Sequence, residues 1–182
     1  ITGKYGSFSG ETFTGEDCQA GFLCKATKRL PLEGYEAHLK NGNSWYMETA
    51  VDGVVDGLTG DHTGIYACNN YDVAKAHIGN NTVNFGGQTL GLPVLADERG
   101  DFTELIVGEQ YHFGKDNFAT LPTDLSATPY ATIENGLWKA TATKPTDGSA
   151  YAEVLDINKR FIEGAYDGGQ KITLRIKRSA KA

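Results

Sequence analysis

Hydrophobic and polar positions alternate over short stretches of this chain. The clearest case is 171–178, where Ile172, Leu174 and Ile176 share one face and Lys171, Thr173, Arg175 and Lys177 share the other. A period of two is typical of a half-buried β-strand. Pieces of four to seven residues also fill 66–114, where Gly, Asn-Asn, Gly-Gly and Pro interrupt them before any could form an ordinary helix. The pattern predicts a mainly β fold, an antiparallel β-barrel or β-sandwich built of short strands.

The same reasoning places the remaining elements. Further strands are predicted at 21–27, 44–51, 136–143, 151–157 and 160–166, and one more begins at Ile65. Turns are predicted at 40–43, where Asn41-Gly42 joins the run 35–39 to the next strand, and at Asp167-Gly168-Gly169. The acidic stretch 52–64 and the Pro-containing stretch 115–132 are predicted to be irregular.

The N-terminus differs from the rest. Residues 1–17 are rich in Gly, Ser and Thr but also contain Tyr5, Phe8 and Phe13, which a flexible linker would lack. We therefore expect an extended arm that packs on the body of its own chain or on a neighbouring subunit. Residues 18–182 form the β-rich domain, which could alternatively divide into two small β subdomains near 115–132.

Composition narrows the classes of partner. The 23 glycines fit a fold with many turns. A formal net charge of −6 argues against direct nucleic-acid binding, which needs a basic excess. Only the C-terminus is locally basic, through Lys171, Arg175, Lys177, Arg178 and Lys181. These residues form either the solvated face of an edge strand or a basic patch that rests on an acidic partner.

Cysteines and hydropathy give expectations about the compartment. Cys18, Cys24 and Cys68 are an odd number, which favours thiols in a reducing compartment, with a Cys18–Cys24 bridge as the alternative. No apolar run is long enough to cross a membrane, and the N-terminus lacks the apolar core of a signal peptide. We expect synthesis in a cytoplasm and no membrane association.

Motifs that would indicate catalysis or cofactor binding are not evident in the sequence. It contains no Gly-x-Ser-x-Gly elbow, no phosphate-binding loop and no dinucleotide fingerprint, and its four histidines are isolated. Asp52, Asp56 and Asp61 lie among glycines, but they lack the alternate spacing and closing Glu of an EF-hand. The expectation is no catalytic residue, no metal and no cofactor.

Two other functions remain open as alternatives. A β-sheet glycoside hydrolase would need two facing carboxylates, with Glu36 or Glu48 opposite Glu104, Glu134 or Glu153. A carbohydrate- or receptor-binding β-module would use Trp45, Tyr46 and Trp138 as stacking platforms, although core packing is the commoner role of such aromatics.

Three stretches carry a family resemblance. Residues 71–82, Gly-Leu-Pro-Val at 91–94 and Leu-Ile-Val-Gly-Glu-Gln-Tyr-His-Phe-Gly at 105–114 resemble small β-rich virion proteins of tailed bacteriophages, of the capsid decoration or head-fibre kind. The resemblance implies a structural protein, made in the host cytoplasm and located in the virion, that binds the outside of a capsid without catalysis or cofactor. The implied partners are the major capsid protein or other virion subunits, and a homo-oligomer is also compatible. The candidate interface residues are Tyr5, Phe8, Phe13, Arg175, Lys177 and Arg178.

Overall fold

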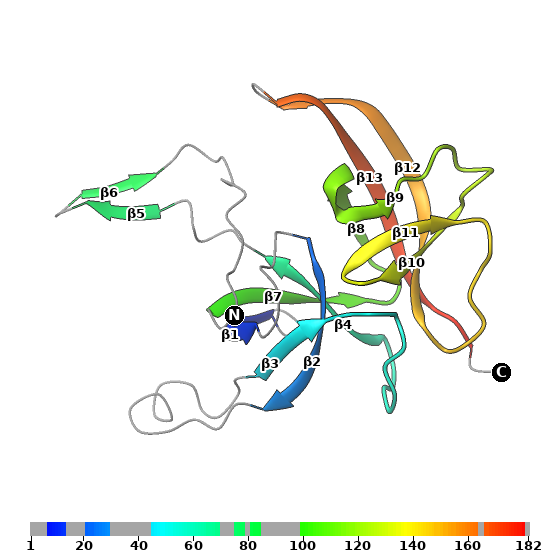
Figure 1. Cartoon of the computed structure of the whole chain (residues 1–182), viewed down its shortest axis with the longest axis horizontal. Coiled ribbons are helices and arrows are strands. Elements are labelled where there is room, and N and C mark those ends of the chain that lie inside the picture. Colours follow the sequence, from blue (N-terminus) through cyan, green and yellow to red (C-terminus); the bar gives the residue numbers. More distant parts are fainter. Residues whose placement is uncertain are drawn as a thin grey trace.

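The structure is a computed structural model of the 182-residue chain (Figure 1). It describes residues 7–13, 21–29, 45–69, 75–78, 81–84, 99–163 and 166–180, and the side chains of 21–26, 47–68, 102–158 and 170–180. Nearly all regular structure is β, which confirms the predicted fold class. Within the described ranges, no helix has the length and apolarity that spanning a bilayer requires.

Five strands pair in a ring, each bonded to two neighbours in the order β1-β3-β2-β4-β7 and back to β1. They are β1 (Ser7–Phe13), β2 (Leu23–Arg29), β3 (Trp45–Thr49), β4 (His62–Asn69) and β7 (Arg99–Ile106). The β1–β3 pair is parallel, whereas the other four pairs are antiparallel. The ring is therefore mainly antiparallel, as predicted, with one parallel pair.

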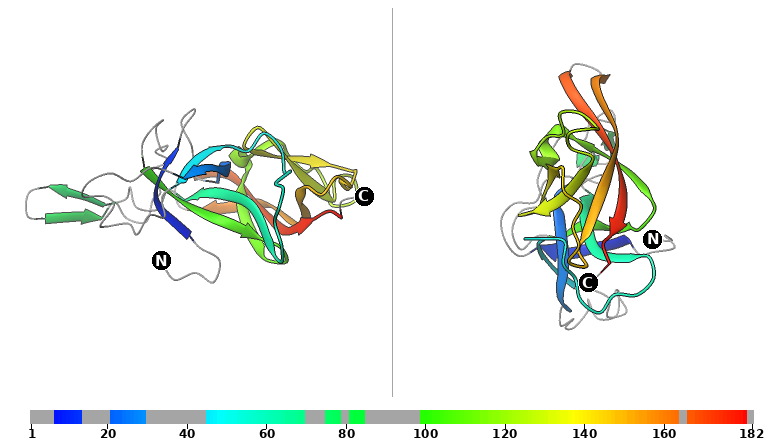
Figure 2. Two further views of the ribbon diagram at one scale, coloured as in Figure 1. Left: turned by 90° about the horizontal axis from the view of Figure 1, so that it is seen from below. Right: turned by 90° about the vertical axis from the view of Figure 1, so that its right-hand side faces the viewer.

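The second sheet has six strands in the order β8-β13-β12-β10-β11-β9 and is open. Its members are β8 (Gln110–Gly114), β9 (Phe118–Thr120), β10 (Tyr130–Glu134), β11 (Leu137–Thr141), β12 (Ala150–Glu163) and β13 (Tyr166–Arg178), with a 3-10 turn η2 (Lys115–Asn117) before β9. The long strands β12 and β13 run side by side in both views of Figure 2. A separate two-stranded sheet pairs β5 (Lys75–Ile78) with β6 (Asn81–Asn84).

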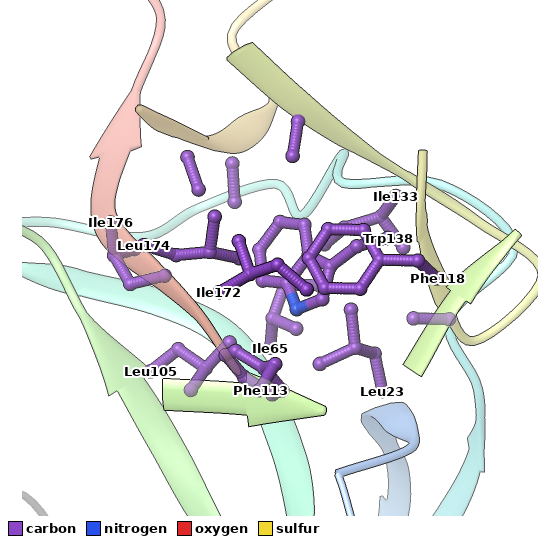
Figure 3. Packing of buried hydrophobic residues seen from close by; sticks show 14 of the residues in the cluster. Leu23, Ile65, Leu105, Phe113, Phe118, Ile133, Trp138, Ile172, Leu174 and Ile176 are labelled. Carbon is purple, nitrogen blue, oxygen red and sulfur yellow. The ribbon is translucent and has the colours of Figure 1, made fainter. Parts of the chain in front are cut away.

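One hydrophobic core lies between the ring and the open sheet (Figure 3). The ring contributes Leu23, Ile65 and Leu105, and the open sheet contributes a larger set that includes Phe113, Phe118, Ile133, Trp138, Ile172, Leu174 and Ile176. The Phe113 and Trp138 rings meet edge to face, with centroids 5.6 Å apart. The alternation predicted for β13 is confirmed, because Ile172, Leu174 and Ile176 are all buried. A smaller cluster within the ring buries Cys24, Met47, Cys68 and Phe102.

Backbone hydrogen bonds join the two sheets directly. After β3, the chain at Ala50 lies between the two sheets: its N–H donates to Leu23 O (3.0 Å), and its carbonyl accepts from Gly136 N (2.8 Å). Gly136 O in turn accepts from Leu23 N (2.8 Å). Asn135-Gly136 forms the turn between β10 and β11 with both φ angles positive, 49° and 80°. The β10–β11 turn is thus locked onto the ring.

A second junction fastens the end of β13. Gly108 N donates to Ile176 O (2.8 Å), and Ile176 N donates to Glu109 O (3.0 Å). Farther along the strand, the Arg178 guanidinium donates to His62 O (2.9 Å) and Gly60 O (3.0 Å). Strand β13, the last along the chain, therefore also holds the start of β4 in the ring.

Several local predictions differ from the structure. Asp167-Gly168-Gly169 is not a turn, because these residues lie inside β13. The predicted strands 151–157 and 160–166 are mostly one long strand, β12, in which register shifts near Asn158 and Phe161 absorb the irregularity. Residues 115–132 are not wholly irregular, since they contain η2, β9 and the start of β10.

The domain boundaries can be compared with the strands. Of the predicted arm 1–17, the structure describes only β1, whose backbone pairs with β3 and β7 of its own chain. The chain changes from the ring to the open sheet at 107–109, before the predicted division at 115–132. The two sheets share one apolar core that spans the interface between them.

Candidate interaction surface

The face of the open sheet that points away from the core is polar. One row of paired residues crosses five strands on this outer face: Gln110, Arg175, Glu153, Tyr130 and Thr141. Further rows pair Lys177 with Tyr151, and Thr173 with both His112 and Asp156. Most of these residues alternate with the buried positions of each strand and therefore face outward, but Tyr151 (2% exposed) and Thr173 (8% exposed) are themselves buried.

Charges on the outer face are arranged in two neighbouring columns. Strand β13 presents Lys171, Arg175 and Lys177, whereas β12 presents Glu153 and Asp156. Lys177 Nζ lies 3.7 Å from Glu153 Oε2, and both side chains are about one-third exposed, 35% and 34%. The basic column is therefore only partly neutralised by the acidic column beside it.

Aromatic side chains lie next to these columns. The Tyr130 and Tyr151 rings meet edge to face with centroids 6.0 Å apart, and Lys144 Nζ lies 5.9 Å from the centre of the Tyr151 ring. Tyr130 is half-buried and Tyr151 is buried. Tyr and Arg are enriched at protein–protein contact surfaces, whereas Lys, Glu and Asp are depleted there.

A second exposed surface is the loop of residues 51–61 between β3 and β4, which reaches from the ring to the open sheet (Figure 1). Lys25 Nζ donates to Asp52 Oδ1 (2.6 Å) and to Val54 O (2.7 Å). The Lys25 bond first, and then the Val54 N–H, hold the pKa of Asp52 below its usual range. Ala150 N donates to Gly53 O (2.8 Å). The loop is thus tied at several points, yet Val51 remains 63% exposed and Val54 37%.

The loop between β9 and β10 is also ordered by its own bonds. The Asp124 carboxylate accepts from Ser126 N (2.7 Å) and Ala127 N (2.9 Å), which fixes a turn. Leu121 and Leu125 are exposed on this loop. Both loops therefore present apolar side chains from a fixed backbone.

The one strongly buried carboxylate with side-chain partners in the described region belongs to Glu104, in β7. Its Oε1 accepts from Gly64 N (3.0 Å), and its Oε2 lies 2.9 Å from His62 Nδ1. The register of β4 against β7 shifts between His62 and Tyr66, so the bulged Gly64 N–H takes a side-chain acceptor instead of a ladder partner. The Glu104 carboxylate therefore accepts the hydrogen bond of an N–H group that the bulge leaves without a ladder partner.

Two tyrosines surround this carboxylate. Burial, and then the Glu104 charge, raise the pKa of Tyr66. Tyr111 Oη accepts from Ile106 N (3.2 Å) and lies 2.9 Å from Glu109 Oε2. Burial raises the pKa of Tyr111 from 10.0 to about 12, with the Glu109 and Glu104 charges adding to the rise and the Ile106 N–H opposing it.

Stability should therefore fall at alkaline pH. Both tyrosines have raised pKa values in the folded chain, so from about pH 10 the unfolded chain loses protons that the folded chain keeps. Their contribution is complete below pH 10 and is lost as the pH rises towards 12. Urea unfolding measured from pH 8 upward should show this decline, and the double variant Tyr66→Phe/Tyr111→Phe should show a shallower slope. Equal slopes in the two proteins would contradict the assignment.

The structure places the predicted interface residues in different environments. Arg175 and Lys177 lie together on the outer face, whereas Arg178 is bound to the carbonyl groups of Gly60 and His62. Phe8 and Phe13 lie in β1, whose side chains are outside the described set, and Tyr5 lies outside the described residues.

The structure also places the residues of the two alternative functions. Trp138 is 1% exposed in the core, so it cannot be a stacking platform. The side chains of Trp45, Tyr46 and Glu36 lie outside the described set. Glu134 Oε1 bonds to Lys139 Nζ (2.7 Å), and Glu153 is near Lys177, so each of these carboxylates has a lysine neighbour. No group of three or more His, Cys, Asp or Glu suited to a metal ion occurs among the described residues.

Sequence reasoning missed the exposed valines of the 51–61 loop. The sequence predicts an irregular stretch there, but the anchors of the loop come from Lys25, Ala150 and Arg178, which are distant along the chain. The Asn135-Gly136 turn could have been found, since it shows the same Asn-Gly signal that was used at Asn41-Gly42.

Comparison of the chain with protein-family models, with curated proteins and with solved structures finds no match in any of the three.

Proposed function

We propose that this chain is a virion structural protein that binds the outside of a phage capsid and stabilises or ornaments it, without catalysis. The partner is the major capsid protein or another subunit of the virion. The family resemblance of 71–82, 91–94 and 105–114 is what suggests this class of protein.

The observation that carries the proposal is the tied loop 51–61 with its exposed valines. Val51 and Val54 lie on a backbone that Lys25, Ala150 and Arg178 hold in place. A fixed loop loses little conformational entropy when it binds, so its exposed apolar side chains contribute more of their burial energy to a contact. An adhesive protein needs such a preformed surface and no reacting groups.

The bonds of three carboxylates support a passive role as well. Glu104 uses both carboxylate oxygens within the fold, one on a bulged N–H and one on His62. Glu134 and Glu153 have lysine neighbours on the outer face. These bonds give each carboxylate a structural explanation.

Co-sedimentation with capsids tests the proposal. Purified protein should pellet with capsids assembled in its absence, and negative-stain microscopy should show added surface density. The variant Val51→Asp/Val54→Asp should bind about tenfold or more weakly, because two exposed apolar contacts are replaced by charges that must be desolvated. Leu125→Asp makes the same kind of change on the other loop and serves as the control.

The outcomes test capsid binding and the role of the loop 51–61 separately. If the unaltered chain fails to pellet with capsids, capsid binding is refuted. If it pellets and the valine variant binds equally well, the contact lies elsewhere on the chain. Deletion of the residues before Gly15 is a poor test of the arm, since it removes β1 from the ring.

A further inference from the structure

The outer face of the open sheet is complementary to itself in charge. Basic column β13 and acidic column β12 are adjacent and antiparallel, and Arg175 is paired in register with Glu153. Glu153 nevertheless forms its ion pair with Lys177, from the next row. Among the described residues, no ion pair involves Arg175.

We propose that this face binds the same face of a second copy of the chain, forming a two-fold symmetric dimer. The axis runs along the strand direction, midway between β12 and β13. Rotation about this axis places β12 of the second copy over β13 of the first copy, and β13 of the second copy over β12 of the first. Arg175 then faces the second copy's Glu153, and by symmetry the ion pair forms twice.

The rest of the central row matches under the same rotation. Strand β10 of the second copy lies over β8, so that its Tyr130 faces Gln110. Tyr151 of the adjacent row lies outside this contact, because it is buried and Lys144 of its own chain packs over its ring.

The dimensions suit a small contact between two copies. Packed sheets lie about 10 Å apart, a gap that extended Arg and Glu side chains span from both sides. Under this rotation β12 and β13 overlap over eight residues rising about 3.4 Å each, and β8 and β10 add one row, which gives a flat footprint of roughly 300 Å² before side chains are counted. A standard contact buries roughly 800 Å² per partner, so we expect a weak dimer that forms at high protein concentration.

A second copy fits the face better than a polyanion does. Glu153, Asp156 and Glu134 lie among the cations, and each would repel a phosphate backbone. A copy of the same face brings its own cations to these carboxylates. The proposal is independent of capsid binding, since it concerns a different surface from the loop 51–61.

Charge reversal tests the dimer with purified full-length protein. Sedimentation velocity over a wide concentration range should show the unaltered chain dimerising, and added salt should weaken the dimer. Arg175→Glu and Glu153→Arg should each weaken self-association about tenfold or more, because like charges then face each other across the axis. Circular dichroism should show that both variants remain folded, since both residues lie on the surface.

Mixing the two single variants is the decisive step. An Arg175→Glu chain opposite a Glu153→Arg chain restores two favourable pairs, so the mixture should form a heterodimer that neither variant forms alone. The double variant Arg175→Glu/Glu153→Arg should again dimerise with itself. A monomeric unaltered chain, assembly that ignores the single changes, or a mixture that stays monomeric would each overturn the proposal. Arg175→Gln with Glu153→Gln replaces any variant that fails to fold, and these neutral changes should also weaken the dimer.

Discussion

Leu174→Asp is expected to prevent the chain from reaching a soluble folded state. Leu174 has no exposed surface and lies in the core shared by the ring and the open sheet. Shortening a buried Leu to Ala alone lowers the free energy of unfolding by about 2–5 kcal/mol. Desolvating a carboxylate without a partner adds several kcal/mol. The sum is comparable to the ~5–15 kcal/mol that stabilises a typical domain.

Expression, solubility and urea unfolding measure this effect. Leu174→Ala should fold and show the smaller loss, which separates the missing packing from the buried charge. Arg175→Asp places the same carboxylate one position along the strand, on the polar outer face, and should remain folded. A soluble Leu174→Asp protein with unchanged unfolding would show that β13 does not line the core.

Gly136→Val is expected to be the second most damaging change. Gly136 has φ of +80°, and an added Cβ would lie 2.1 Å from Phe22 Cζ. A residue other than Gly in such a conformation costs about 1–3 kcal/mol by itself. Either the Phe22 ring or the turn must move to relieve the clash, and the N–H and carbonyl of Gly136 hold the turn by bonds to Ala50 and Leu23. We expect a loss of more than about 3 kcal/mol in the free energy of unfolding.

Gly57 offers a matched control for this prediction. Its φ is +77°, nearly that of Gly136, but nothing lies within 4 Å of an added Cβ. Gly57→Val should therefore show the conformational cost without the clash. Thermal and urea unfolding of both variants isolate the contact with Phe22, and Phe22→Ala should partly rescue Gly136→Val. Equal losses at the two glycines would mean that the Phe22 contact is unimportant.

Sequence reasoning succeeded where the signal was local. The alternation of 171–178 predicted a strand with Ile172, Leu174 and Ile176 inside and Arg175 and Lys177 outside, and the structure agrees. It failed at Asp167-Gly168-Gly169, because glycines that favour a turn also fit a long strand whose register shifts. It also failed to find β9 and β10 within 115–132, where prolines mask short strands that tertiary pairing stabilises.

The candidate surfaces depended more strongly on tertiary structure. Arg178 was grouped with Arg175 and Lys177 by sequence, but strand pairing directs its guanidinium to carbonyl groups more than a hundred positions away. The sequence allowed Trp138 to be a stacking platform, but the structure buries its side chain in the core. Glu104 gained its role only when a bulge in the neighbouring strand exposed the Gly64 N–H.

The amino-acid sequence by itself determined that the chain is mainly β, that one face of β13 is apolar and the other basic, and that turns are frequent. These properties follow from the two-residue period of strands and the backbone preferences of Gly and Asn, which act over a few residues. The tertiary structure decided which strands are neighbours, which charges share the outer face and which loop is tied down. Such features join residues far apart in the chain, and a local pattern carries no information about its distant partner.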